Sequence, residues 1–224
     1  MSIMKKEILY NKKSRDELKA ELQNETFVRR TCSFYRYVQI DKPEELRDDL
    51  YREWSSLKIF GRIYISPEGI NAQLSCPEKN WDSLIANLNS HTMLKEMPLK
   101  IAIEDGESFY KLKIKVKDEI VAYNVNDDEY NMNKVGHHLS AEEFNKKLDQ
   151  DNTFVVDMRN YYESEVGQFE NAIIPDVDTS RELLPEVRKL LAGHQDDEIL
   201  LYCTGGIRCE KASAYLIHHG FKHV

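Results

Sequence analysis

The sequence predicts an N-terminal α+β domain followed by an α/β domain with a mainly parallel sheet. Three observations lead to this prediction. The 224 residues exceed what one compact domain usually needs. Helix and strand patterns follow the order β-α-β-β-α-β in the first half and alternate in the second. Residues 126–138 are polar, lack periodicity, and are expected to form a linker between the two domains.

The first domain is predicted to cover residues 27–125, after an N-terminal extension at 1–26. A strand at 31–40 is rich in aromatic and β-branched residues, and Leu46, Leu50, Trp54 and Leu57 then recur at helical spacing. Further elements follow in order: strands at 59–66 and 69–76, a helix opened by Pro77, and a strand at 99–103. This order is that of a ferredoxin-like fold, in which two helices pack on one face of an antiparallel sheet.

The last strand of this domain, KLKIKVK at 111–117, alternates strictly between apolar and basic residues. Alternate residues of a strand lie about 6.7 Å apart, so its lysines would form a stripe suited to a phosphodiester backbone. The other interpretation is a solvated face whose lysines protect a sheet edge, and composition alone favours it. The stripe consists of Lys111, Lys113, Lys115 and Lys117. Arg29, Arg30 and Arg36, interleaved with Tyr35 and Tyr37, are a weaker candidate for the same surface.

The second domain is predicted to cover residues 139–224. Ser140 and Glu143 form a capping box for a helix through Leu148, and a buried strand at 153–159 ends in Asp157 and Arg159. A helix at 183–191 and a strand at 198–202 follow, so strands and helices alternate as in a parallel sheet. Another strand begins at 221–224, and we therefore expect the domain to be truncated at its C-terminus.

Composition excludes several classes of protein. Residues 126–224 hold 10 basic and 19 acidic side chains, so the net charge of −8 resides mainly in the C-terminal half. No apolar segment approaches the roughly 18 residues of a membrane helix, and the N-terminus lacks the apolar core of a signal peptide. Four cysteines are too sparse for a disulfide framework. A cytoplasmic protein with reduced thiols and no membrane partner is expected.

The stretch CTGGIR at 203–208 joins the predicted strand 198–202 directly to a helix. Open α/β sheets place their ligands at this end of a strand. Glycines allow the backbone N–H groups to point inward, and with the helix dipole they favour a thiolate at Cys203. Cys203 is the candidate nucleophile; the alternative is a buried structural cysteine beside a glycine turn. The loop that would cradle it consists of Thr204, Gly205, Gly206, Ile207 and Arg208, with Arg208 binding an anionic group or bracing the loop.

Other polar residues near this loop are assigned supporting roles. Asp157 and Arg159 are expected to form a strand-end ion pair that fixes the loop rather than to react. Cys209 either resolves an oxidised Cys203 or is a helix-buried thiol, and the second is favoured. His137 and His138 have no partners at ligand spacing, so no metal site is expected. No cofactor is identifiable, because flavin, haem and facial-triad signatures are missing from the sequence.

Four residues separate Cys203 from Arg208, whereas cysteine phosphatases have five, and the shorter loop resembles that of a rhodanese domain. Together with EGINAQLS (68–75), FYKLKIKVKDEIV (109–121) and VGHHLSAEEF (135–144), it is similar to the rhodanese-containing family of oxygen-dependent tRNA uridine hydroxylases. This resemblance implies 5-hydroxylation of the wobble uridine of bacterial tRNA, with Cys203 required and molecular oxygen as co-substrate. It also implies tRNA as the partner and favours the lysine stripe as an RNA contact.

Two other functions stay open at this point: a sulfurtransferase that carries a persulfide on Cys203, and a non-catalytic module that binds RNA or protein. The segment 166–176 lacks the His-Ile-Pro-Gly that rhodanese domains usually carry before the site, which argues against sulfur transfer from thiosulfate. The sequence sets no oligomeric state.

Overall fold

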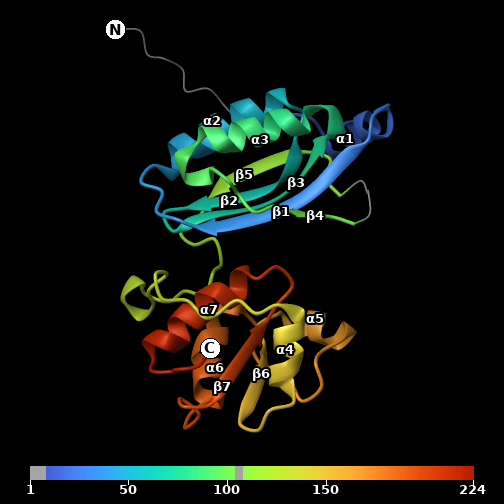
Figure 1. Ribbon diagram of the computed structural model, residues 1–224. Helices are drawn as coiled ribbons and strands as arrows, with labels where there is room; N and C mark the ends of the chain where they lie inside the picture. Colours follow the sequence, from blue (N-terminus) through green and yellow to red (C-terminus); the bar gives the residue numbers. More distant parts are fainter. Residues whose placement is uncertain (1–8, 104–107) are drawn as a thin grey trace. The chain divides into compact units, whose positions relative to one another are not determined.

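A computed structural model of the chain describes residues 9–103 and 108–224 (Figure 1). The chain divides into two compact units, residues 1–120 and 121–224. None of the helices in the described ranges is long and apolar enough to cross a membrane.

Unit 1 is a five-stranded sheet in the order β4-β1-β3-β2-β5, antiparallel except for the pair β2 and β5. Helices α2 and α3 lie along the same face of this sheet (Figure 1). The elements are α1 (Arg15–Gln23), β1 (Arg29–Tyr37), α2 (Pro43–Ser56), β2 (Phe60–Ser66), β3 (Gly69–Pro77), the 3-10 turn Glu78–Asn80, α3 (Trp81–Ser90), the 3-10 turn Thr92–Leu94, β4 (Lys100–Ile101) and β5 (Leu112–Val116). The order from β1 to β4 confirms the predicted α+β fold, and β5 adds a strand beside β2.

The core of unit 1 lies between the sheet and its two helices. Phe34, Ala72, Ile63 and Ile114 stand side by side in the strand register, and all are buried. Trp54 of α2 is fully buried against this row, edge-on to Phe34, and its indole N–H donates to Asn87 Oδ1 at 2.6 Å. Burial of a side chain such as Phe34 or Ile63 contributes about 1.5–3 kcal/mol to stability. The same alternation sends every second strand residue to the opposite face.

The boundary between the units falls earlier than the residue 125 expected from the sequence. Val121 and Tyr123 are buried in the core of unit 2, where the Tyr123 hydroxyl donates to the carbonyl oxygen of Arg208 at 3.2 Å. Further along, Gly136 N–H donates to Ser213 Oγ at 2.8 Å. The stretch expected to be a linker at 126–138 therefore packs on unit 2, through isolated contacts that leave no periodic pattern in the sequence.

Unit 2 is built around the parallel pair β6 and β7, with β6 Asp157 opposite β7 Tyr202. Parallel bridges at Ile173 and His223 extend this pairing on either side. The elements are the 3-10 turn Asp127–Glu129, α4 (Ala141–Leu148), β6 (Thr153–Asp157), α5 (Tyr161–Val166), α6 (Ser180–Leu190), β7 (Glu198–Tyr202) and α7 (Ile207–His218). The capping box of Ser140 and Glu143 forms as predicted, whereas α5 was not foreseen.

Candidate functional site

Cys203 is the first residue after β7, and α7 begins four residues later at Ile207. The intervening loop turns at Gly206, whose φ of 90° lies in the left-handed region that favours glycine. This turn aims the Gly206 N–H at the cysteine, and it donates to Cys203 Sγ at 3.1 Å. The predicted loop thus wraps the sulfur at the N-terminus of a helix.

The surroundings of Cys203 lower the pKa of its thiol to about 5. The largest cause is a hydrogen bond from the Cys209 side chain; the backbone N–H groups of Cys209, Gly206 and Gly205 act in the same direction, and burial opposes them. The dipole of α7 also favours negative charge at this position. Cys203 is therefore a thiolate at neutral pH. Cys209 lies in α7 and its thiol donates to Cys203; this bond together with burial raises the pKa of Cys209 well above its ordinary value. Whether Cys209 also resolves an oxidised Cys203 stays a prediction.

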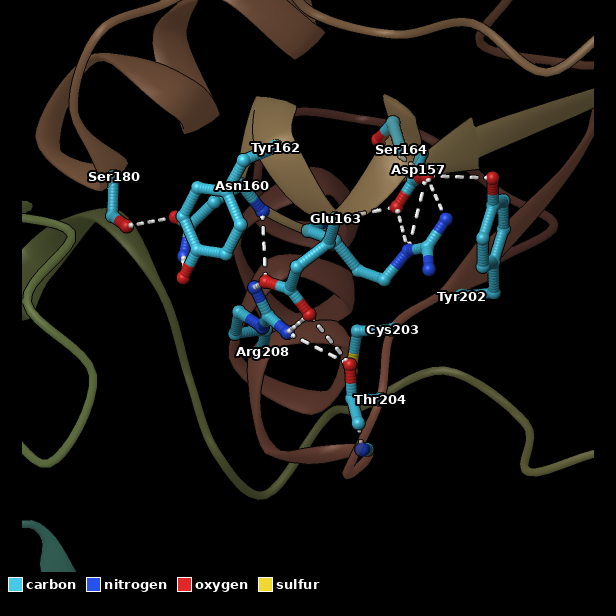
Figure 2. Close-up of polar contacts among 12 residues, drawn as sticks. Asp157, Asn160, Tyr162, Glu163, Ser164, Ser180, Tyr202, Cys203, Thr204 and Arg208 are labelled. Carbon is cyan, nitrogen blue, oxygen red and sulfur yellow. Dashed lines mark hydrogen bonds and ion pairs between the residues drawn. The ribbon is translucent and has the colours of Figure 1, made fainter. Parts of the chain in front are cut away.

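The loop is closed from the side by Glu163, which lies on α5 (Figure 2). Its carboxylate accepts from Arg208 Nη1 at 2.8 Å and Nη2 at 3.1 Å, and from Thr204 Oγ1 at 2.7 Å. The bonds from Arg208, and then from Thr204, lower the pKa of Glu163 to about 2, although burial opposes them. We call these three residues the clamp. Of the two roles expected for Arg208, the structure shows the bracing one, since its charge is balanced by Glu163.

A second polar cluster is centred on Asp157, at the end of β6 (Figure 2). Its fully buried carboxylate accepts two hydrogen bonds of 2.9 Å from the backbone N–H and Nε of Arg159, and one of 2.8 Å from Arg159 Nη2. It also accepts from Tyr202 O–H at 2.7 Å and Ser164 Oγ at 2.8 Å. Burial alone would raise the pKa of Asp157, but these bonds together lower it. The expected ion pair is present, and the other hydrogen bonds of the Asp157 carboxylate tie β6 to β7 through Tyr202 and to α5 through Ser164.

Four residues of this arrangement were missed by sequence reasoning: Glu163, Ser164, Tyr202 and Tyr123. Glu163 carried one local signal, because it is the third residue of α5 and closes a capping box with Asn160. That signal predicts a helix start and says nothing about the contact with Arg208, 45 residues away. Tyr123 and Tyr202 resemble ordinary core aromatics in the sequence, and only the fold brings their hydroxyl groups to the loop and to Asp157.

The predicted lysine stripe lies in unit 1, on and beside the edge strand β5. Lys113, Lys115 and Lys117 are exposed, and Lys111 is half-buried with its Nζ 5.5 Å from the centre of the Tyr110 ring. Leu112 and Ile114 are buried in the core, so the expected alternation of apolar and basic side chains along this strand is confirmed. Its role in RNA binding stays a prediction.

The weaker expectation of a nucleic-acid surface at three arginines of β1 is wrong for Arg29, which is buried, and it stays a prediction for Arg30 and Arg36, whose guanidinium groups already have partners within unit 1. Arg29 is buried against Phe60 and pairs with Glu25 at 2.6 Å. Arg30 pairs with Glu78 at 2.7 Å, and Arg36 donates to three backbone carbonyl groups at residues 93–96. Charge counted along the sequence does not reveal these internal partners.

In the part of the chain that the structure describes, no group of three or more His, Cys, Asp or Glu side chains is arranged to hold a metal ion. The groups that the loop itself offers for chemistry are the Cys203 sulfur and the donors around it. An anionic sulfur held by backbone N–H groups suits nucleophilic attack or the carriage of a second sulfur atom.

The depressed pKa of Cys203 predicts an unusual pH profile for alkylation. Thiolates react with iodoacetamide and thiols do not, so the rate of carbamidomethylation of Cys203 should rise with pH to a midpoint near 5. An ordinary cysteine would show its midpoint near 8.5. Peptide mass spectrometry across pH 3–9 measures the rate at each cysteine separately, and a midpoint above 7 at Cys203 would contradict the geometry.

Cys209→Ala provides the comparison for this profile. It removes the side-chain hydrogen bond that lowers the pKa of Cys203 most, while the backbone hydrogen bonds from Gly205 and Gly206 remain. The midpoint at Cys203 should move to higher pH in this variant. Cys76→Ala is the matched control, since Cys76 is buried in unit 1 and should leave the midpoint where it is.

Comparison with known proteins agrees with this architecture. A family model described as the UPF0176 acylphosphatase like domain matches residues 29–120, and one described as the rhodanese-like domain matches residues 140–224. The chain is 54% identical over 221 residues to the tRNA uridine(34) hydroxylase of Leptospira interrogans, with 98% of the chain and 60% of that protein covered.

Relatives from other bacteria carry the same name. The protein of Photorhabdus laumondii is 48% identical over 219 residues and that of Pectobacterium carotovorum 49% identical over 219, each covering 97% of the chain and 62% of the relative. The chain thus spans about 60% of the length of these curated relatives. With both domains matched in order, the chain belongs to the rhodanese-domain-containing family of tRNA uridine hydroxylases.

Proposed function

We propose that the protein catalyses the oxygen-dependent 5-hydroxylation of the wobble uridine of tRNA, with Cys203 as its reactive thiolate. The observation that carries this proposal is the convergence of hydrogen-bond donors on the Cys203 sulfur at the start of α7, which also lowers its pKa to about 5. The names of the relatives support the reaction and its tRNA substrate. A tRNA substrate also favours a cytoplasmic location.

The reaction needs a reductant besides the site. Insertion of one oxygen atom from O2 into the C5–H bond leaves the second atom to be reduced to water, and we assign the two electrons and two protons this takes to a pair of external thiols that is oxidised to a disulfide. A thiolate beside a protonated thiol, as at Cys203 and Cys209, can act as a nucleophile and has a proton donor in contact. We propose nucleophilic catalysis by Cys203, with Cys209 as the group that stabilises its charge.

A sulfurtransferase remains the second candidate, because the same cradle of N–H groups would stabilise a persulfide. The clamp disfavours thiosulfate as the sulfur donor, because the Arg208 guanidinium that would bind this anion is already paired with Glu163. Transfer of sulfur from thiosulfate to cyanide, measured on the wild-type protein, tests this candidate directly.

Cys203→Ser provides the test of the proposed function. In a strain that lacks every other route to 5-hydroxyuridine, the wild-type protein should restore this nucleoside in tRNA, and Cys203→Ser should reduce it at least 100-fold. The serine hydroxyl is not ionised at neutral pH, so the nucleophile is lost while the shape of the loop is kept. Nucleoside mass spectrometry of purified tRNA gives the yield, and Cys32→Ser, a substitution in the core of unit 1, is the control. Equal yields from wild type and Cys203→Ser would refute the role of the thiolate.

A further inference from the structure

We propose that unit 1 binds an unpaired segment of RNA on the face of its sheet that points away from α2 and α3, with tyrosine rings stacking on bases and basic side chains binding phosphates. We call this the helix-distal face. The proposal rests on the proposed function, to which it adds the conformation of the RNA that is recognised and the residues that recognise it.

The strand register defines this face. Ser33, Gln73, Arg62 and Lys113 stand opposite one another on β1, β3, β2 and β5. The next row along the strands consists of Tyr35, Asn71, Tyr64 and Lys115. The residues between these rows, such as Phe34 and Ile63, point into the core beneath the helices. Because side chains alternate along a strand, both rows lie on the helix-distal face.

The charge on these two rows has one sign. Arg62, Lys113 and Lys115 are exposed, and none of the three has an ion-pair partner among the described residues. Neither row contains a carboxylate. Neighbouring strands lie about 4.8 Å apart and alternate residues about 6.7 Å, so the three cations form a compact group along the β2–β5 edge of the sheet. Such a group attracts a polyanion.

The cations without an ion-pair partner lie along one edge of the face. On the opposite edge, Lys100 of β4 stands opposite Ser33 in the first row and is exposed, but it already takes part in another interaction. Arg29 also lies on the helix-distal side, but its guanidinium is buried over Phe60 and neutralised by Glu25. A backbone of phosphates would therefore follow the β2–β5 edge rather than spread over the whole sheet.

Aromatic rings occupy the adjoining positions. Tyr35 and Tyr64 flank Asn71 in one row, and Tyr37 lies next to Tyr35 with ring centres 6.2 Å apart and planes at 73°. These rings are half-buried, so the sheet holds them in place while part of each remains accessible. Aromatic side chains on an open sheet are a common platform for stacking RNA bases, and each stacked base strengthens binding roughly 10-fold.

The combination of rings and cations decides between possible partners. Cations alone would bind an acidic protein equally well. The tyrosine rings in the same rows add stacking contacts, which planar bases make best. In an RNA duplex the bases stack on one another and cannot reach the tyrosines. We therefore infer an unpaired segment, such as the loop of a hairpin, with the three cations on its backbone.

The test measures binding of the whole chain to two fluorescein-labelled RNA probes by fluorescence anisotropy: an unstructured 12-nucleotide strand and a 12-base-pair duplex. Tyr35→Ala/Tyr64→Ala should weaken binding of the single strand at least 10-fold and that of the duplex less than 2-fold. Lys113→Gln/Lys115→Gln should weaken both and lower the salt dependence of single-strand binding by a slope of about 1.4, since each lost phosphate contact removes about 0.7.

Matched variants separate recognition from damage to the fold. Tyr35→Phe/Tyr64→Phe keeps the rings and should bind the single strand within 2-fold of wild type. Lys19→Gln/Lys42→Gln removes the same charge from exposed positions on or beside α1 and α2 and should leave the salt slope unchanged. Circular dichroism and thermal unfolding confirm that each variant is folded, so a loss of binding by a folded variant counts for the proposal.

Several results would overturn the proposal. Single-strand binding within 2-fold of wild type in Tyr35→Ala/Tyr64→Ala removes the stacking role. Equal affinity of the wild-type chain for polyglutamate and for the single strand shows an acidic-protein surface instead. Failure of the hydroxylation test with the binding pattern intact refutes the proposed function alone, whereas intact hydroxylation with unchanged binding in both double variants refutes the helix-distal face alone.

Discussion

Replacing Asp157 by alanine is expected to lower the free energy of unfolding of unit 2 by about 3–5 kcal/mol, as removal of one partner from a buried ion pair usually does. The side chain is fully buried, and its loss leaves Arg159, Tyr202 and Ser164 without their acceptor. Urea unfolding followed by far-UV circular dichroism gives the change. Tryptophan fluorescence would not report on unit 2, because both tryptophans lie in unit 1.

Asp151→Ala is the matched control for this substitution. Asp151 is an exposed aspartate two residues before β6, and its replacement should change the free energy of unfolding by less than about 0.5 kcal/mol. Asp157→Asn should fall between the two, because the amide keeps one acceptor oxygen and loses the charge. A loss below about 1 kcal/mol in Asp157→Ala would show that Asp157 does not hold the three elements together.

Opening the clamp is expected to reduce the yield of 5-hydroxyuridine about 100-fold, the typical cost of misplacing a reacting group by about 1 Å. Glu163→Gln and Arg208→Gln each remove one side of the same bidentate pair. The double variant should be no worse than either single variant, because residues that act as a unit give non-additive losses. Mass spectrometry of tRNA nucleosides, with the yield corrected for the amount of folded protein, provides the measurement.

Glu165→Gln removes the same charge from an exposed position of α5 and should retain wild-type yield. Losses that multiply in the double variant would mean that Glu163 and Arg208 act independently, and the clamp would then be the wrong description. The alkylation rate of Cys203 adds a readout that does not depend on the RNA reaction, since a displaced loop also changes the access of iodoacetamide to the sulfur.

Local pattern was sufficient to predict the elements that carry the fold. Alternation predicted β5, helical spacing of Leu46, Leu50 and Trp54 predicted α2, and the capping box at Ser140 predicted the start of α4. Each of these signals lies within a few residues of the element it predicts, because side-chain spacing and capping are local properties. The order of these elements and the polar stretch at 126–138 then predicted two domains, and the loop at 203–208 gave the resemblance of the second to a rhodanese domain.

Partners distant in the sequence could not be predicted in this way. The acceptor of Arg208 lies on α5, 45 residues earlier, and the donor to the carbonyl oxygen of Arg208 is Tyr123, 85 residues earlier. From the sequence, Arg208 could either bind an anionic group or brace the loop, because an arginine suits both roles. Only the position of Glu163 distinguishes them. Arg29 was misjudged for the same reason, since its burial over Phe60 depends on how β1 and β2 each pair with β3.

The two acidic transitions of the site are well separated. As pH falls through about 5, Cys203 takes up a proton and its contribution to stability and reactivity as an anion is lost. Glu163 retains its charge until pH approaches 2, and the bonds to Arg208 and Thr204 persist with it. Mild acid therefore protonates the sulfur while the hydrogen bonds around the loop persist, and raising the pH alone should restore the thiolate without any need to refold.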